Sequence, residues 1–175
     1  MSAAAEAALD PVRDEARLRD IAELDLFAPE VGERLAAHAR RAAERFGLPI
    51  SLVSIVLDDA QFLAGQHGVG GWIGEAAGTP VEWSFCANTV RTRDAFVVED
   101  ATIHPAVRDN PLVSLDGIRC YAGIPMVSSR GSVLGSFCVI GTEARSFSPG
   151  ELAELREMTA AVVAELETRR QPLDD

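Results

Sequence analysis

Lysine is absent from this chain of 175 residues, so all 16 of its basic residues are arginines. Aspartate and glutamate outnumber them at 27, which gives a net charge of −11. Surfaces rich in phosphate attract clustered positive charge, and no basic stripe runs through this sequence. We therefore expect no nucleic acid and no membrane among its partners. The missing lysine also excludes a P-loop, whose lysine contacts the phosphates of a bound nucleotide.

Long apolar runs and paired cysteines are missing as well. No stretch approaches the roughly 18 apolar residues of a membrane-spanning helix. The first residues lack the basic and apolar regions of a secretory signal. Three cysteines at wide spacing, Cys86, Cys120 and Cys138, are typical of reduced thiols rather than of a disulfide scaffold. These absences together predict a cytoplasmic protein.

Metal-ligand patterns are equally scarce. The three histidines, His38, His67 and His104, are scattered along the chain. No cluster of Cys, His and Asp has the spacing of a metal site. The sequence therefore predicts no metal, and it identifies no cofactor.

Regular apolar patterns are present, and hydrophobic residues make up 47% of the chain, enough for one domain with a sizeable core. Apolar residues at helical spacing predict helices over about 10–25 and 29–46, and a third that begins at Ser148, where Glu151 completes a capping box. Runs rich in apolar and β-branched residues predict strands at 50–57, 61–66, 95–98, 117–127 and 132–141. The glycine-rich segment 65–82 is interpreted as a mobile loop, followed by a short helix at about 84–90.

This order of elements predicts an α+β fold. Strands that follow one another in hairpins form a mainly antiparallel sheet. Because several of these strands are apolar on both faces, the sheet must be covered on both sides. The terminal helices can cover one side, while the loop and the short helix cover the other. An irregular cover of this kind favours a cavity.

Several segments resemble the GAF family of sensory modules, and most closely the GAF domains that precede bacterial histidine kinases and diguanylate cyclases. The resemblance covers residues 20–168, with tails at 1–19 and 169–175. The matching segments are Leu24-Asp25, ArgPheGlyLeuPro at 45–49, SLVSIV at 51–56, SFCA at 84–87, VVEDA at 97–101, DNPLV at 109–113, GIRCYAGIPM at 117–126 and LGSFCVI at 134–140.

The resemblance implies a central antiparallel sheet of five or six strands with the terminal helices on one face. Those helices often join a partner's helices in a dimer. Loops and short helices on the other face would form a pocket, which family members use for varied small molecules. No output domain follows residue 170, so we expect a stand-alone module that passes its signal to another chain. The apolar stripe of the last helix likewise predicts a homodimer.

Known ligands of the family fit this sequence poorly. The cyclic-nucleotide motif of some members contains a lysine, which this chain lacks. Phytochrome-type members attach a bilin through a cysteine commonly followed by histidine, whereas Ala87, Tyr121 and Val139 follow the cysteines here. The ligand is therefore predicted to be an unknown small molecule.

The candidate ligand-binding residues surround the expected pocket. On the strand from Ile118, alternation places Arg119 and Tyr121 on one face, where they could hold a carboxylate or a planar ligand. The full set is Trp83, Phe85, Cys86, Asn88, Asp100, Arg119, Tyr121 and Cys138. A structural alternative has Arg119 paired with Asp100 or Asp116, Tyr121 in the core and Trp83 as an anchor of the loop.

The function expected from these features is signal transduction without catalysis. A bound ligand would order the loop at 65–82 and the short helix, and the change would reach the flanking helices. Two alternatives stay open. One is a thiol enzyme similar to the free-methionine-sulfoxide reductases, although cysteine spacings of 34 and 18 residues differ from theirs. The other is a dimerisation module without a ligand.

Overall fold

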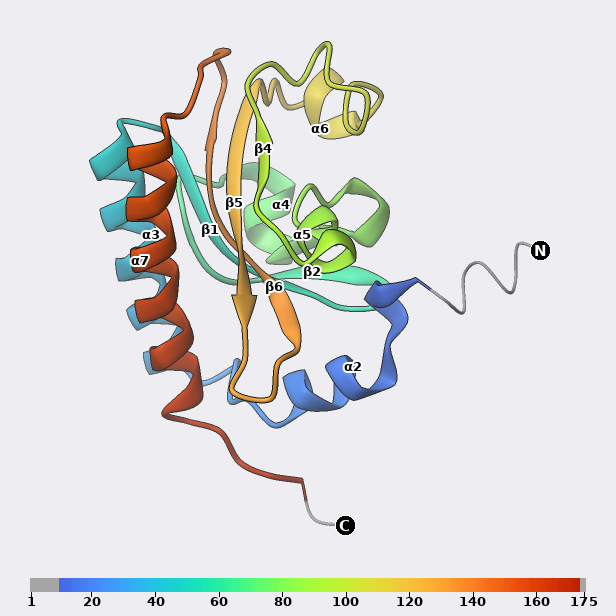
Figure 1. Cartoon of the computed structure of the whole chain (residues 1–175), viewed down its shortest axis with the longest axis vertical. Coiled ribbons are helices and arrows are strands. Elements are labelled where there is room, and N and C mark those ends of the chain that lie inside the picture. Colours follow the sequence, from blue (N-terminus) through green and yellow to red (C-terminus); the bar gives the residue numbers. More distant parts are fainter. Residues whose placement is uncertain (1–9, 174–175) are drawn as a thin grey trace, which may run out of the picture.

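A six-stranded antiparallel sheet forms the centre of the molecule (Figure 1), whose computed structural model describes residues 10–173. Its strand order is β3-β2-β1-β6-β5-β4. The strands are β1 (Ile50–Val56), β2 (Ala60–His67), β3 (Gly78–Pro80), β4 (Phe96–Val98), β5 (Cys120–Val127) and β6 (Val133–Gly141). The α+β fold class and the antiparallel sheet expected from the sequence are confirmed. Parts of the two predicted tails, residues 1–9 and 174–175, lie outside the described residues.

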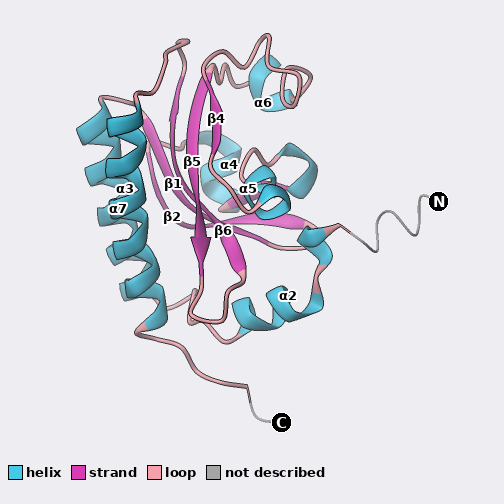
Figure 2. Ribbon diagram, in the orientation of Figure 1, coloured by secondary structure: helices cyan, strands magenta, loops and turns pink. Residues whose placement is uncertain are grey.

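Helices cover both faces of this sheet. Figure 2 shows α3 and α7 side by side on one face, while α4, α5 and α6 lie on the other. The helical segments are η1 (Pro11–Arg13), α2 (Glu15–Ala22), α3 (Pro29–Phe46), α4 (Gly71–Ala76), η2 (Val81–Trp83), α5 (Ala87–Thr92), α6 (Pro111–Ser114) and α7 (Pro149–Glu167). Among residues 10–173, no helix combines the length and the apolar character needed to cross a membrane.

The two long helices form where their end signals predict. The Ser148 side chain accepts a hydrogen bond from the Glu151 backbone, and the Glu151 side chain accepts one from the Ser148 backbone, which completes the capping box of α7. Helix α3 ends at Phe46, and Gly47 follows it with a φ of 65°, a conformation that glycine adopts far more readily than other residues. One face of each helix is buried on the sheet, with Leu35 of α3 and Leu155 of α7 almost fully covered.

Strand β6 lies at the centre of the sheet and is buried along its whole length. It pairs with β1 on one side and with β5 on the other. Its residues alternate between two apolar cores. Phe137 belongs to the core under α3 and α7, whereas Cys138 belongs to the core on the opposite face. A continuous apolar strand covered on both faces matches the pattern seen in the sequence.

The segment 65–82 is more regular than predicted. It contains the end of β2, all of α4 and β3 and the start of η2, and β3 pairs with β2. Interpreting it as a mobile loop was wrong because two of its glycines serve close packing rather than flexibility. A Cβ on Gly65 would lie 2.5 Å from the Cβ of Leu35 on α3, and one on Gly78 would collide with the carbonyl oxygen of Gln61. Glycine is the residue that permits such backbone contacts.

The first predicted helix is also divided. Asp10 caps the short helix η1, and Asp14 then caps α2 with a hydrogen bond from the backbone of Arg17. Val12 and Arg17 are both buried, and the Arg17 guanidinium donates to the carbonyl oxygens of Val12 and Val133. The packed body therefore begins before residue 20.

Candidate functional site

A cavity of about 160 Å³ lies on the sheet face that α4, α5 and α6 cover. Its floor is the sheet, and its roof comes from the segment after β2, the start of α5 and the region of α6. Most of the wall is apolar and includes Leu52, Leu63, Phe85, Leu112, Ile118 and Ile140. The polar lining groups are Gln61, Thr79, Cys86, Asp116 and Tyr121. An apolar pocket with a few convergent polar groups is the usual form of a small-molecule site.

The amide of Gln61 is held in one orientation beneath the cavity. Its Oε1 accepts hydrogen bonds from Ser54 Oγ at 2.8 Å and from Ser84 Oγ at 2.7 Å. Its Nε2 donates to Thr79 Oγ1 at 3.2 Å. All four side chains are buried. Because each partner is itself satisfied, the network fixes polar groups in the cavity floor without an energetic penalty for orphaned atoms.

Tyr121 links the floor to the start of α5. Its hydroxyl lies 2.8 Å from Ser136 Oγ and donates to Cys86 Sγ at 3.1 Å. The ring of Phe85 packs against it with centroids 5.4 Å apart. Burial raises the pKa of Tyr121 well above its usual range, so the hydroxyl keeps its proton and remains a donor.

The absence of a side chain at Gly123 leaves the space that the Tyr121 ring occupies. A Cβ at this position would lie 2.7 Å from Cζ of Tyr121 and would collide with its hydroxyl oxygen. The two residues share one face of β5, as alternation from Ile118 predicted. The ring therefore lies along its own strand over a position that has no side chain.

Two cysteines meet where Tyr121 ends. Cys86 Sγ lies 3.9 Å from Cys138 Sγ, and both residues are fully buried, although Cys86 borders the cavity. Burial raises the pKa of the Cys86 thiol, but its hydrogen bonds with Cys138 and Tyr121 outweigh this and lower it. Burial raises the pKa of Cys138 well above its ordinary value, and its hydrogen bond with Cys86 adds to the increase. Of the two sulfurs, Cys86 is therefore the one that ionises more readily.

Four of the eight predicted site residues gather at this cavity. Phe85, Cys86 and Tyr121 line it, and Cys138 lies behind Cys86. Trp83 and Asn88 are near in sequence but not among the lining residues. The Trp83 ring packs edge-on against Trp72 at 5.6 Å, and Asn88 Nδ2 donates to the carbonyl oxygen of Phe85 at 3.0 Å.

Asp100 and Arg119 both form hydrogen bonds with groups close to them in the sequence. Asp100 accepts two hydrogen bonds from Thr102, which close a tight turn. Arg119 Nη1 donates to the carbonyl oxygens of Val113 and Ile118, both at 2.9 Å. Among residues 10–173, neither Asp100 nor Asp116 forms an ion pair with Arg119.

The sequence reasoning missed Gln61 and Thr79 in the cavity lining. It also missed two buried serines, Ser54 beside Gln61 and Ser136 beside Tyr121. A signal existed, because Ser54 and Ser136 are hydroxyl residues within mainly apolar strands. A polar side chain in such a strand must find a buried partner. The two serines lie directly opposite each other in the β1–β6 pair. Their proximity therefore depends on the register of the two strands.

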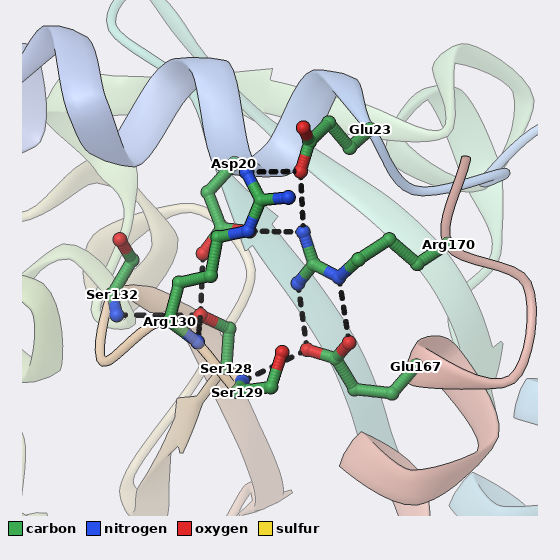
Figure 3. Close-up of polar contacts among 8 residues, drawn as sticks. All are labelled: Asp20, Glu23, Ser128, Ser129, Arg130, Ser132, Glu167 and Arg170. Carbon is green, nitrogen blue, oxygen red and sulfur yellow. Dashed lines mark hydrogen bonds and ion pairs between the residues drawn. The ribbon is translucent and has the colours of Figure 1, made fainter. Parts of the chain in front are cut away.

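A second polar cluster lies outside the cavity and connects three parts of the chain (Figure 3). Arg170, just beyond α7, donates to Asp20 Oδ1 at 2.5 Å and to Glu23 Oε2 at 2.7 Å, both near the end of α2. It also holds Glu167 with two hydrogen bonds of 2.7 Å. We refer to this cluster, Asp20, Glu23, Ser128, Ser129, Arg130, Glu167 and Arg170, as the Arg170 clamp.

The β5–β6 turn is the third part of the clamp. Ser128 Oγ donates to Asp20, and the backbone NH of Ser129 donates to Glu167 Oε1 at 2.9 Å. Arg130 pairs with Glu23 at 2.6 Å. The Arg170 guanidinium lowers the pKa of Glu167 to about 2 despite the opposing effect of burial. The end of α7 is thereby tied to the sheet through charge-assisted hydrogen bonds.

The family model for the GAF domain matches residues 33–167. A cyclic di-GMP phosphodiesterase of Pseudomonas aeruginosa is 36% identical over 149 residues, which cover 84% of this chain and 24% of that protein. The chain thus spans about a quarter of the length of that relative.

Two solved structures share the fold. One is the GAF domain of a phosphoenolpyruvate-protein phosphotransferase from Coxiella burnetii, with 19% identity, a TM-score of 0.67 and coverage of 92% of this chain and 95% of that one. The other is the free methionine-R-sulfoxide reductase from Neisseria meningitidis in complex with its substrate. It has 20% identity, a TM-score of 0.65 and coverage of 99% and 97%. At these identities the likeness concerns the fold alone.

Proposed function

Because this chain belongs to the GAF family, we propose that it is a sensory module of a cytoplasmic signalling system and binds a small molecule in its cavity. The identity with a cyclic di-GMP phosphodiesterase over a quarter of that protein supports a regulatory role next to a signalling enzyme. The chain itself is assigned no catalysis under this proposal. Its ligand is a compact, mainly apolar molecule with at least one hydrogen-bonding group.

The observation that carries the proposal is the combination of an apolar wall with a fixed polar floor. Leu52, Leu63 and Ile140 offer dispersion contacts and burial to a ligand. Gln61 and Tyr121 offer polar atoms whose directions are set by buried partners. Such preorganisation reduces the entropy lost on binding. A dimerisation module without a ligand has no need for this arrangement.

The signal would leave through the helices at the far side of the sheet. A ligand that binds one conformation of α4 and α5 more tightly shifts the population toward that conformation. Helix α5 contacts β5 and β6, the two strands that lead to the β5–β6 turn, where the Arg170 clamp holds the end of α7. A change in the clamp would alter α7 and its contacts with a second copy of the chain or with a signalling partner.

Native mass spectrometry of the chain purified from a bacterial host tests ligand binding directly. We expect an added mass that disappears on denaturation. Leu63→Phe places a larger side chain in the cavity and should remove that mass. The matched control is Leu115→Phe, because Leu115 is 76% exposed and is not a lining residue. Retention of the added mass in Leu63→Phe would place the ligand elsewhere and contradict the proposal.

Hydrogen exchange tests the path of the signal. With the released molecule added back, protection should rise in α4 and α5 and change at the clamped end of α7. Unchanged exchange in α7 would contradict the signalling route while leaving ligand binding intact.

The meeting of Cys86 and Cys138 favours a second candidate, a thiol-dependent reductase of free methionine sulfoxide. The Neisseria structure of that activity shares the fold. Turnover of free methionine-R-sulfoxide by the purified chain, lost in Cys86→Ser, would establish this candidate in place of the sensor. No turnover above that of Cys86→Ser would exclude it.

A further inference from the structure

The two sulfurs beneath the cavity are close enough to bond after a small movement. Cys86 Sγ and Cys138 Sγ are 3.9 Å apart, whereas a disulfide requires about 2.0 Å. Closing this gap needs a shift of about 2 Å. Cys86 precedes the short helix α5, while Cys138 lies in the central strand β6, so the movement can come from the helix start alone.

The two thiols have different surroundings, and this difference assigns them different roles. Cys86 borders the cavity and accepts a hydrogen bond from Tyr121. Cys138 does not border the cavity and lies directly behind Cys86. The pKa of Cys86 is also lowered while that of Cys138 is raised. A reagent that enters the cavity therefore meets the more nucleophilic sulfur first.

The cavity limits which reagent can reach Cys86. At about 160 Å³ it has room for a few water-sized groups. The one charged side chain among its described lining residues is the carboxylate of Asp116, which disfavours anions. A small, neutral oxidant fits these limits. Hydrogen peroxide and short alkyl hydroperoxides have this size and charge.

We propose that Cys86 and Cys138 are a redox pair that a small hydroperoxide entering the cavity converts into a disulfide. The Cys86 thiolate attacks the outer peroxide oxygen, and the O–O bond breaks. The leaving hydroxide or alkoxide takes up the proton that the thiol released and departs as water or alcohol. Cys86 thereby becomes a sulfenic acid. The Cys138 sulfur then attacks Cys86 Sγ, the S–O bond breaks, and the hydroxyl leaves as water with the Cys138 proton.

The hydroperoxide and the two thiols supply all the atoms and electrons of this reaction. The hydroperoxide gains two electrons, and the two thiols lose one each. Tyr121 has a defined part in it, because its protonated hydroxyl stabilises negative charge on Cys86 and is held in place by Ser136. The redox pair uses the same cavity as the proposed sensory ligand, but its oxidation does not require that ligand to exist.

The test is oxidation of the full, reduced chain with hydrogen peroxide and, in parallel, with tert-butyl hydroperoxide. Free thiols are counted after denaturation, and linked peptides are mapped by mass spectrometry. The number of free thiols per chain should fall from three to one, with a single disulfide between Cys86 and Cys138. If all three thiols survive a treatment that fully oxidises free cysteine, or if the bridge includes Cys120, the proposal is overturned.

Three variants separate the roles. Cys120→Ser is the matched control, because Cys120 is buried but is not a lining residue, and this variant should still form the bridge. Cys138→Ser should stop at a Cys86 sulfenic acid that dimedone captures, and Cys138→Ala gives the same readout if serine disturbs the core. Circular dichroism verifies that each variant is folded. Dimedone capture at Cys120 instead of Cys86 would overturn the assignment.

Two further measurements sharpen the result. Tyr121→Phe removes the donor to Cys86 and should slow oxidation roughly tenfold, as expected for one hydrogen bond to a charged group. An unchanged rate would overturn the part assigned to Tyr121.

Methionine-R-sulfoxide serves as a competing oxidant. If it forms the bridge while both hydroperoxides fail, the redox pair belongs to the reductase candidate and the hydroperoxide proposal is overturned.

Discussion

The ring of Tyr121 lies along its own strand over Gly123, and this relationship carries the tyrosine hydroxyl to Cys86 and Ser136. The contact is possible because position 123 has no Cβ. A residue two positions away on one strand thereby sets the geometry at the floor of the cavity.

Gly123→Ala should destabilise the protein by about 1–3 kcal/mol, the usual cost of inserting a methyl group into a packed core. The new Cβ would lie 2.7 Å from Cζ of Tyr121, so the ring must move away from Cys86. Urea unfolding followed by circular dichroism measures the change. Gly150→Ala is the control, since its Cβ has only Ser148 Oγ within 4 Å, at 3.9 Å. Equal stabilities for the two variants would contradict the tight contact over position 123.

Gln61→Met keeps the length of the side chain but removes its polar atoms. The hydroxyl groups of Ser54 and Ser84 would then lose their acceptor inside the core. We expect a loss of about 1–3 kcal/mol, as for other buried groups left unsatisfied. Thermal and urea unfolding provide the measurement. A matched change at Gln66, whose Oε1 accepts one hydrogen bond from the Val69 backbone, should cost less.

Arg170→Ala leaves two buried carboxylates, those of Asp20 and Glu23, without their shared cation. Removal of one partner from a buried charge cluster is strongly destabilising. We expect the Tm to fall by roughly 5–10 °C. The neighbouring substitution Arg169→Ala removes only a 3.4 Å contact with exposed Glu30 and should change the Tm by about 1 °C. Similar shifts for both variants would show that the Arg170 clamp is not a structural tie.

The Arg170 clamp also predicts a dependence on pH. The guanidinium of Arg170 lowers the pKa of Glu167 from 4.5 to about 2 despite burial. Since the folded-state pKa lies below the unfolded one, ionised Glu167 stabilises the fold above pH 4.5, and this contribution is lost as the pH falls from 4.5 to about 2. Glu167→Gln should therefore be less stable than the natural chain at pH 7, and the difference should shrink through that window. A difference that is constant from pH 7 to pH 2.5 would contradict the pairing.

Local sequence signals predicted the long helices and the sheet. The Ser148–Glu151 capping box and the glycine at 47 fix the ends of α7 and α3 from within a few residues. Strands β1 and β6 were recognisable because nearly every position is apolar or small. These features, together with the family resemblance, were sufficient for the α+β fold and for the face that holds the cavity.

The remaining features depend on contacts between distant residues. Arg119 precedes β5 instead of lying within it, so the alternation that placed Tyr121 correctly could not predict that Arg119 turns back to Val113. The glycines of segment 65–82 were taken as a sign of mobility, although Gly65 faces Leu35 from another element. Arg170 and Asp20 are 150 positions apart, and no local sequence pattern predicts their ion pair.

The position of β6 between β1 and β5 has a consequence for synthesis on the ribosome. Leu52 finds its β6 neighbour in Cys138, so the edge of β1 has no partner until that later strand has been translated. Until then the β1–β2 hairpin exposes an apolar, unpaired border of the type that recruits other chains. Nascent chains that stall before Gly141 will be prone to aggregate, whereas the finished polypeptide conceals that border at the middle of its sheet.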